Sequence, residues 1–185
     1  MAKRDSSASD EWLMAQVRDG SVAAFQALYE RHHRALFNFL VRLLADRPRA
    51  EDLLQEAFLR VFLHRETYRP TAAFRTWLFT IARNLALDEL RQRRASPELK
   101  RGEILGTVTD PGATPLQQAE GEELGERLQT AVQSLPLSQR EVLLLSRFAG
   151  LSHEEIARVT GASAAAVRVT LHRALNRLRD LLGPV

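Results

Sequence analysis

LSHEEIARVTGASAAAVRVTLHRALNRLRDLL, residues 151–182, predicts two helices joined by a very short turn. Ser152 and Glu155 have the spacing of a capping box, in which each side chain satisfies a backbone N–H at the helix start. Gly161 comes next, and glycine readily adopts the left-handed conformation that commonly ends a helix. Ser163 can then cap a second helix.

The second of these helices has two different faces. Its apolar residues recur at helical spacing, and they are Val167, Leu171, Leu175 and Leu178. Its other sides carry basic or hydrogen-bonding residues, namely Arg168, Thr170, His172, Arg173, Asn176 and Arg177. A helix with this division can lie in a DNA major groove. On this stretch alone, an ordinary helical hairpin with a solvated basic face remains the alternative.

Length and composition restrict the class of protein. With 185 residues, of which 45% are hydrophobic, the chain can bury a core in one domain or in two small ones. The net charge of +3 is compatible with a nucleic-acid partner but does not require one. The absence of cysteine excludes disulfides and thiolate metal sites. The sequence contains neither a secretion signal nor a membrane-spanning apolar run, so we expect a cytoplasmic protein without membrane insertion.

The first part of the chain is predicted to be a helical domain over residues 10–96, preceded by a disordered N-terminus, residues 1–9. Apolar residues recur at helical spacing in the ranges 10–19, 22–45, 49–64 and 74–94. The neighbouring His32 and His33 face different sides of their helix, which makes them a poor metal pair. We therefore predict no metal site.

The helix predicted over residues 49–64 has an outer face that could bind a protein. On this face a leucine lies among acidic and amide residues, and the set is Asp52, Gln55, Glu56 and Leu59. A leucine exposed between carboxylates is a plausible docking surface. An ordinary solvated helix surface explains the pattern equally well, and both interpretations stay open at this point.

The helix predicted over residues 74–94, with the loop before it, could bind single-stranded nucleic acid. Between Arg83 and Arg101 there are six Lys or Arg against three Asp or Glu. Basic residues interleaved with aromatic ones suit a single strand, because the cations bind phosphates and the rings stack on unpaired bases. Trp77 is better explained as a core residue, whereas Tyr68 in the loop is the better stacking candidate.

Residues 97–123 are predicted to be a flexible linker. They contain four of the nine glycines and three of the seven prolines, and residues 103–126 include six acidic residues and no basic one. Residues 124–185 predict a four-helix domain that ends in the helix-turn-helix, with a further capping box of Ser138 and Glu141. No β pattern occurs, so the predicted fold is all-α, with two small helical domains joined by a flexible acidic linker.

No sequence pattern indicates catalysis. A nucleotide-binding glycine loop, an HExxH motif and a cysteine–histidine pair are all missing. Glu154 and Glu155 lie at a predicted helix start, where the helix macrodipole explains carboxylates better than acid–base chemistry does. We predict that the protein is not an enzyme and needs no cofactor.

Three stretches are informative together. They are RAEDLLQEAFLRVF (residues 49–62), FRTWLFTIARNLALDELRQRR (74–94) and LPLSQREVLLLSRFAGLSHEEIARVTGASAAAVRVTLHRALNRLRDLL (135–182). In order and separation they resemble the motifs of extracytoplasmic-function sigma factors, the minimal two-domain class of bacterial RNA polymerase specificity subunits. The resemblance covers nearly all of the chain from about Asp10, and it implies a transcription initiation factor.

The resemblance assigns roles within the first predicted domain. The mixed face over residues 49–64 would dock on the clamp helices of the largest subunit of core RNA polymerase. A pocket for a flipped base of the −10 promoter element would be formed by Glu66, Thr67, Tyr68 and Arg69. Strand or duplex contacts would come from Arg75, Trp77, Arg83, Asn84 and Arg91. Flipping a base costs about a few kcal/mol, which contacts in the pocket must offset.

The resemblance also assigns roles to the linker and the second domain. The linker would pass through the polymerase cleft, and the second domain would bind the flap of the second-largest subunit. The −35 element would be read by Ser163, Ala165, Arg168, Val169, Thr170, His172, Arg173 and Arg177. Members of this family are commonly held inactive by an anti-sigma factor, so we expect such a partner.

One part of the chain departs from the family pattern. Family members usually have polar or basic residues at several exposed positions of the recognition helix, whereas residues 164–166 and Val169 are apolar here. We expect direct readout by Arg168, Thr170 and Arg173, with DNA shape contributing more than usual.

Two other functions remain open. A stand-alone helix-turn-helix regulator would bind duplex DNA tightly without polymerase, but it leaves the motifs of the first domain unexplained. A protein that only binds and blocks polymerase would need no promoter selectivity, which leaves the two basic helices without a purpose.

Overall fold

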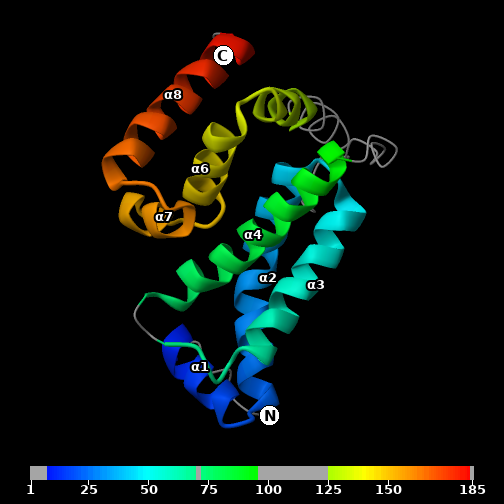
Figure 1. Ribbon diagram of the computed structural model, residues 1–185, viewed down its shortest axis with the longest axis vertical. Coiled ribbons are helices and arrows are strands. Elements are labelled where there is room, and N and C mark those ends of the chain that lie inside the picture. The colour runs from blue at the N-terminus through cyan, green and yellow to red at the C-terminus, as the bar shows by residue number, and fades with distance from the viewer. Residues whose placement is uncertain (1–7, 70–71, 96–124, 184–185) are drawn as a thin grey trace, which may run out of the picture.

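The computed structural model describes residues 8–69, 72–95 and 125–183, arranged as shown in Figure 1. All regular structure within these residues is helical, which confirms the predicted all-α class. None of the described helices has the length and apolar character needed to cross a membrane. The predicted linker, residues 97–123, lies outside the described residues.

The first domain consists of α1 (Asp10–Arg18), α2 (Val22–Leu44), α3 (Arg47–Leu63) and α4 (Phe74–Ala95). The first three helices begin with a side chain that accepts a hydrogen bond from a backbone N–H of the first turn, and these caps are Ser9, Ser21 and Asp46. The long helix α2 contacts α1, α3 and α4, so its apolar side becomes the centre of the core. Phe39 of α2 meets Phe79 of α4 edge to face there, with 5.5 Å between ring centroids.

The second domain consists of the helical residues 125–133, α6 (Leu137–Arg147), α7 (His153–Thr160) and α8 (Ala164–Leu182). Helices α7 and α8 are the predicted helix-turn-helix. Ser152 and Glu155 form both hydrogen bonds of the predicted capping box. Gly161 ends α7 with φ +73°, and the Ser163 hydroxyl accepts the N–H of Ala166 at 3.1 Å. These three predictions are confirmed.

The predicted capping box of Ser138 and Glu141 is wrong. Helix α6 begins at Leu137, and Pro136 at its N-cap makes no side-chain cap bond. Glu141 is buried instead, 5% exposed, and its carboxylate pairs with the guanidinium of Arg83 on α4. This pair joins positions far apart in the chain, so no local pattern could reveal it.

The chain is already ordered just before α1. Ser9 accepts a hydrogen bond from a backbone N–H of α1 at 3.1 Å. Ala8 packs against the core, and its carbonyl accepts a bond from the Arg31 guanidinium at 3.0 Å. The prediction of disorder over residues 1–9 is therefore wrong for Ala8 and Ser9, while residues 1–7 lie outside the described ranges.

The two domains pack against each other. Helix α7 lies against α4, and α6 lies against α2 (Figure 1). Helix α8 packs on α6 and α7 at the outer edge of the molecule. The two helices associated with DNA by the sequence therefore differ in their surroundings, because α4 lies between the domains and α8 does not.

Candidate nucleic-acid interface

Helix α8 brings the predicted −35 residues to one open surface. Val167, Ala174 and Leu178 are buried, and they attach the helix to the rest of the second domain. The exposed residues are Ser163, Ala165, Arg168, Val169, His172, Arg173 and Arg177, and Thr170 is half-buried beside them. Their spacing places most of them on the face opposite the buried residues.

Three arginines on this surface have free guanidinium groups. Within the described residues, Arg168, Arg173 and Arg177 make no side-chain hydrogen bond or ion pair. His172 and Asn176 bind each other, with 3.0 Å between the imidazole Nε2 and the amide nitrogen. The arginines are therefore available for phosphates or base edges, and the 49% exposed Val169 adds an apolar contact beside them.

The predicted −10 residues of α4 are less accessible. Asn84 and Arg91 are exposed, and Arg91 pairs with Asp88 at 2.7 Å. Arg75 and Trp77 are half-buried. Part of the surface expected to bind DNA is thus covered by protein.

Arg83 faces the second domain. Its guanidinium lies 3.3 Å from a carboxylate oxygen of Glu141, and the Arg83 side chain is 16% exposed. Two turns before Arg83 on α4, the Thr76 hydroxyl donates to the Glu155 carboxylate of α7 at 3.2 Å. The sequence suggested neither contact, because both join the two domains.

The loop before α4 presents three of its four predicted residues. Glu66, Thr67 and Arg69 are exposed. The Thr67 hydroxyl donates to the carbonyl of His64 at 2.9 Å, and the Arg69 guanidinium donates to the carbonyl of Glu66 at 3.1 Å. These local bonds hold the loop in a defined turn with polar groups facing solvent.

The expectation that Tyr68 offers an open stacking surface is wrong for this conformation. Tyr68 is 4% exposed, and its ring packs against Trp77 and Phe74, with centroids 4.9 Å and 6.2 Å away. Burial, with the nearby charges of Glu11 and Asp10, raises the pKa of Tyr68 to about 12. Its hydroxyl has no hydrogen-bond partner among the described residues. The aromatic cluster buries more apolar surface than an exposed ring would, which explains the inward position.

The outer face of α3 is open. Asp52, Gln55 and Leu59 are exposed, and Glu56 is half-buried and pairs with Arg60 at 2.6 Å. Apolar exposure continues next to this face, with Leu59 54%, Phe62 38% and Leu63 61% exposed. The combination of carboxylates and exposed apolar groups favours a docking surface for another protein.

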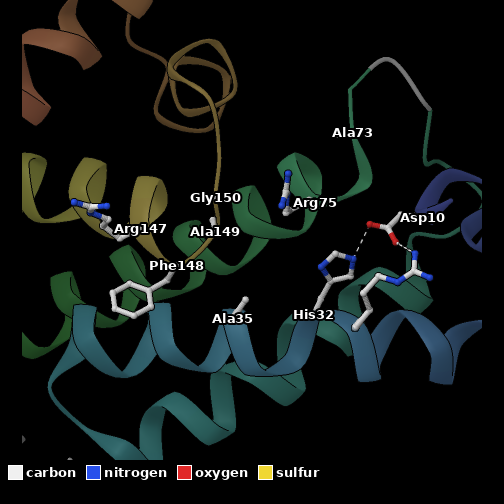
Figure 2. A pocket seen from close by; sticks show the side chains of 10 residues that line it. Asp10, His32, Ala35, Ala73, Arg75, Arg147, Phe148, Ala149 and Gly150 are labelled. Carbon is white, nitrogen blue, oxygen red and sulfur yellow. Dashed lines mark hydrogen bonds and ion pairs between the residues drawn. The ribbon is translucent and has the colours of Figure 1, made fainter. Parts of the chain in front are cut away.

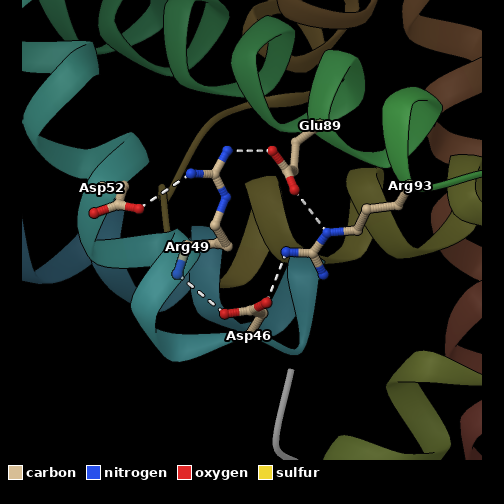
Figure 3. Close-up of polar contacts among 5 residues, drawn as sticks. All are labelled: Asp46, Arg49, Asp52, Glu89 and Arg93. Atoms are coloured by element: carbon tan, nitrogen blue, oxygen red, sulfur yellow. Dashed lines mark hydrogen bonds and ion pairs between the residues drawn. The ribbon is translucent and has the colours of Figure 1, made fainter. Parts of the chain in front are cut away.

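A charged network fixes α3 against α4 (Figure 3). The Glu89 carboxylate of α4 accepts bonds from Arg49 of α3 and, at 2.7 Å, from Arg93. Arg93 also donates to Asp46, the cap of α3, at 2.7 Å. The hydrogen bond from Arg49, followed by that from Arg93, holds the pKa of Glu89 below its ordinary value. No local sequence pattern indicates this network, which joins α3 to α4 by ion pairs.

A pocket of about 550 Å³ lies between the domains (Figure 2). Asp10 in its wall accepts bonds from Arg31 and, at 2.7 Å, from the His32 ring. Figure 2 shows Arg75 and Arg147 on its other sides, from α4 and α6. Burial alone would raise the pKa of Asp10, but the interactions with His32 and Arg31 outweigh burial and lower it. Among the described residues, no cluster of three or more His, Asp or Glu is placed to hold a metal ion.

Comparison with known families matches both domains. Residues 28–96 match the Sigma-70 region 2 family, and residues 125–178 match the Sigma-70 region 4 family. RNA polymerase sigma factor CarQ of Myxococcus xanthus is 39% identical over 170 residues, which are 92% of this chain and 95% of that protein. ECF RNA polymerase sigma factor SigX of Bacillus subtilis is 33% identical over 162 residues, 84% of this chain and 81% of SigX.

Solved structures share the two-domain fold. The structure of CnrH in complex with the cytosolic domain of CnrY has a TM-score of 0.71 at 29% identity and covers 94% of this chain and 96% of CnrH. The sigma factor RpoE of Bartonella quintana, in complex with the anti-sigma factor NepR, has a TM-score of 0.72 at 25% identity and covers 87% of this chain and 98% of RpoE.

Both domains, the helix-turn-helix and the match over nearly the whole chain define a two-domain, sigma-70-type protein. The chain belongs to the extracytoplasmic-function (ECF) family of RNA polymerase sigma factors, which are transcription initiation factors. The predicted family is confirmed.

Proposed function

We propose that this chain binds bacterial core RNA polymerase in the cytoplasm, directs it to promoters with matching −10 and −35 elements, and promotes their melting without catalysis of its own. The observation that carries the proposal is the presence of two different open surfaces on separate domains. Helix α8 exposes Arg168, Arg173 and Arg177, which have no partner in the part of the chain that the structure describes, and α3 exposes carboxylates beside apolar side chains. The first suits DNA and the second suits a protein.

The −35 element is read by α8 in this proposal. Arg168 and Arg173 provide base-edge or phosphate contacts, and Val169 together with the Thr170 methyl contacts thymine methyl groups. The exposed Ser163, Ala165, His172 and Arg177 complete the footprint. The side chains of Ala165 and Val169 cannot form hydrogen bonds with bases. DNA shape therefore contributes strongly to the −35 sequence preference.

The −10 element is bound by the first domain. The rim of Glu66, Thr67 and Arg69 contacts a flipped base, and Asn84 with Arg91 follows the strand. These residues are exposed and lie in the loop or on α4. The half-buried Arg75, Trp77 and Arg83 complete this surface.

Core polymerase is bound at two places. The α3 face of Asp52, Gln55, Glu56 and Leu59 docks on the clamp helices of the largest subunit. The flap of the second-largest subunit occupies a groove of about 420 Å³ in the second domain. This groove includes Ala131, Leu181 and Leu182, and an exposed leucine at position 128 lies on the helical residues beside it.

An anti-sigma factor is a further proposed partner. The structurally similar sigma factor RpoE was solved in complex with the anti-sigma factor NepR, and the structurally similar CnrH was solved in complex with the cytosolic domain of CnrY. Their similarity extends over both domains of this chain, so a partner that contacts both domains is compatible with its fold.

Transcription with core polymerase tests the proposal. A pool of promoter fragments from the source genome would be transcribed with and without the protein, and the new starts mapped. We expect starts that occur only with the protein and that share a −10 and a −35 motif. Tight binding of duplex DNA by the protein alone, without new transcription starts, would instead indicate a stand-alone regulator. Binding to polymerase with loss of existing starts would indicate a blocking protein.

A further inference from the structure

The first turn of α4 is capped by a side chain of another helix. The backbone N–H of Phe74, the first residue of α4, donates to the Glu11 carboxylate of α1 at 3.1 Å. Ala73 stands just before α4 and has no side-chain acceptor, whereas α1, α2 and α3 each receive a cap bond from the residue before them. A helix start leaves backbone N–H groups that need an acceptor. Glu11 therefore supplies an acceptor where the local cap position supplies none.

The start of α1 is anchored on α2, beside the start of α4. The Asp10 carboxylate, next to Glu11 in the sequence, accepts bonds from Arg31 and, at 2.7 Å, from the His32 ring (Figure 2). The His32 side chain is 8% exposed, and its ring centroid lies 5.5 Å from that of Phe74. Asp10 therefore holds α1 on α2, and Glu11 joins the same turn of α1 to α4.

The loop proposed to contact the −10 element packs on this same place. We call the −10 rim its exposed residues proposed to contact a flipped base, namely Glu66, Thr67 and Arg69. Tyr68, in the middle of the rim, is buried, and its ring packs against those of Phe74 and Trp77. Burial, followed by the charges of Glu11 and then Asp10, raises the pKa of Tyr68 to about 12, so both carboxylates lie near this ring. The rim is thus supported by Tyr68, Tyr68 by Phe74, and Phe74 by Glu11.

We propose that Glu11 is a positioning residue for −10 recognition, because its bond to Phe74 holds the packing under Tyr68 and thereby the shape of the −10 rim. This inference rests on the proposed sigma-factor function. Glu11 acts through Phe74 and Tyr68 and does not touch DNA itself. A rim held in one conformation before binding loses less conformational freedom when the strand binds, so the bond contributes to −10 affinity. Helix α8 lies in the other domain, so −35 binding does not depend on Glu11.

Two substitutions at Glu11 separate the hydrogen bond from the charge. Glu11→Ala removes the acceptor of the Phe74 N–H, whereas Glu11→Gln removes the charge and keeps a side-chain carbonyl oxygen that can accept the same N–H. Ser21→Ala is the matched control, because it removes another cap bond of the first domain, in which the Ala24 N–H donates to the Ser21 hydroxyl at 3.2 Å. Thermal unfolding followed by circular dichroism verifies that each variant is folded.

A further variant restores a cap to α4 without restoring its link to α1. This local-cap variant combines Glu11→Ala with Ala73→Ser, and Ala73 is exposed, so the added hydroxyl has room. A serine before the first turn can accept a backbone N–H of that turn. If Glu11 only stabilised α4, the local cap would replace it. If Glu11 holds α4 against α1, the local cap restores the stability of α4 but not the position of the rim.

The first measurement is the fluorescence of Trp77, which packs directly against the inward-facing tyrosine of the loop. The other tryptophan, Trp12, is 55% exposed, so Trp12→Phe is included in every protein compared. We expect Glu11→Ala to shift the emission of Trp77 to the red and to increase its quenching by acrylamide. The local-cap variant should behave in the same way, whereas Glu11→Gln and Ser21→Ala should keep the wild-type emission. Unchanged emission and quenching in Glu11→Ala would overturn the proposal.

The second measurement is the affinity of the complex with core polymerase for a fluorescent single-stranded DNA that carries the −10 motif read from the mapped starts. Glu11→Ala should weaken this binding about 10-fold, within the range for residues that act through packed neighbours. Glu11→Gln and Ser21→Ala should bind like the wild-type protein. The local-cap variant should recover its unfolding midpoint but not its −10 affinity. Full recovery of −10 affinity in that variant, or no loss in Glu11→Ala, would overturn the proposal.

The same proteins distinguish failure of this inference from failure of the proposed function. Binding of the −35 duplex should be equal in the wild-type protein and in all the variants. A wild-type complex without new transcription starts would overturn the proposed function, and this inference with it. New starts from the wild-type complex, together with an unaffected Glu11→Ala variant, would overturn this inference alone.

Discussion

Helices α4 and α8 both carry residues proposed to contact the promoter, yet the fold exposes them differently. Arg168, Arg173 and Arg177 of α8 are exposed and unpaired among the described residues, whereas Arg83 of α4 is paired with Glu141 and Arg75 is half-buried. Helix α8 is held from one side only, by α6 and α7. Helix α4 contacts α2 and α3 within its own domain and α7 of the other. Basic residues on a helix therefore indicate a DNA surface only after its neighbours are known.

The largest expected effect comes from truncating a core residue of the second domain. Ile156 of α7 is fully buried, and Ile156→Ala should lower the free energy of unfolding by about 2–5 kcal/mol through lost burial and a cavity. Chemical denaturation measures the loss. Since α7 supports α8 and contacts α4, −35 binding should weaken and the distance between the domains should increase.

Val22→Ala is the control for this prediction. Val22 is 74% exposed, so its truncation should change the free energy of unfolding by no more than about 0.5 kcal/mol. An equally small effect of Ile156→Ala would contradict the described core.

A second prediction concerns the network that joins α3 and α4 inside the first domain. Glu89→Gln leaves Arg49 and Arg93 without their shared charged partner, and it should cost about 1.5–3 kcal/mol of unfolding free energy at pH 7. The folded-state pKa of Glu89 is lowered. Its contribution is therefore present above the unfolded pKa and lost as pH falls through the folded value.

Denaturation of wild type and Glu89→Gln across pH checks this assignment. The difference between the two proteins should be constant near neutrality and shrink below the ordinary glutamate pKa of 4.5. Asp88→Asn is the control, since its ion pair with Arg91 is exposed and should contribute about 0–1 kcal/mol. A difference that persists at the lowest pH would show that charge is not the cause.

The third prediction separates the two DNA surfaces. Arg173→Ala should weaken binding to the −35 duplex by about 1–3 kcal/mol if Arg173 contacts a base. Binding to single-stranded −10 DNA should not change, because α8 lies apart from α4. Fluorescence anisotropy on both probes measures the effects. Arg158→Ala, at an exposed position of α7 outside the proposed footprint, is the matched control; a similar loss in both variants would reduce the role of Arg173 to general charge.

The smallest effects compare two helix caps. Ser163→Ala and Ser152→Ala each remove a hydroxyl that accepts a backbone N–H, and each should cost about 1 kcal/mol in thermal or chemical unfolding. Ser163→Ala should also weaken −35 binding slightly, because it loosens the first turn of α8. Ser152→Ala should instead affect the distance between the domains, since Glu155 of the same capping box binds Thr76. If the two variants had identical effects on −35 binding and on the distance between the domains, neither cap would be linked specifically to one of these two properties.

Local patterns were sufficient for much of the fold. The capping box of Ser152 and Glu155, the left-handed Gly161 and the cap Ser163 depend on residues within a few positions of each other, and all three were predicted. The Ser138–Glu141 box had the same local signal and did not form. Its carboxylate was instead taken up by Arg83, at a separation of 58 residues. A local motif does not show whether a residue distant in the sequence will bind the same side chain.

The sequence by itself determined the all-α class, the helix-turn-helix, the family and the basic outer side of α8, because these depend on spacing along the chain. Only the tertiary structure decided that Tyr68 packs inward, that Glu89 joins α3 to α4, and that the second domain covers Arg83. The physical reason is that burial and ion pairing depend on which surfaces meet. A side chain such as Arg83 has the same identity in solvent, on DNA or against Glu141, and the fold selects among these environments.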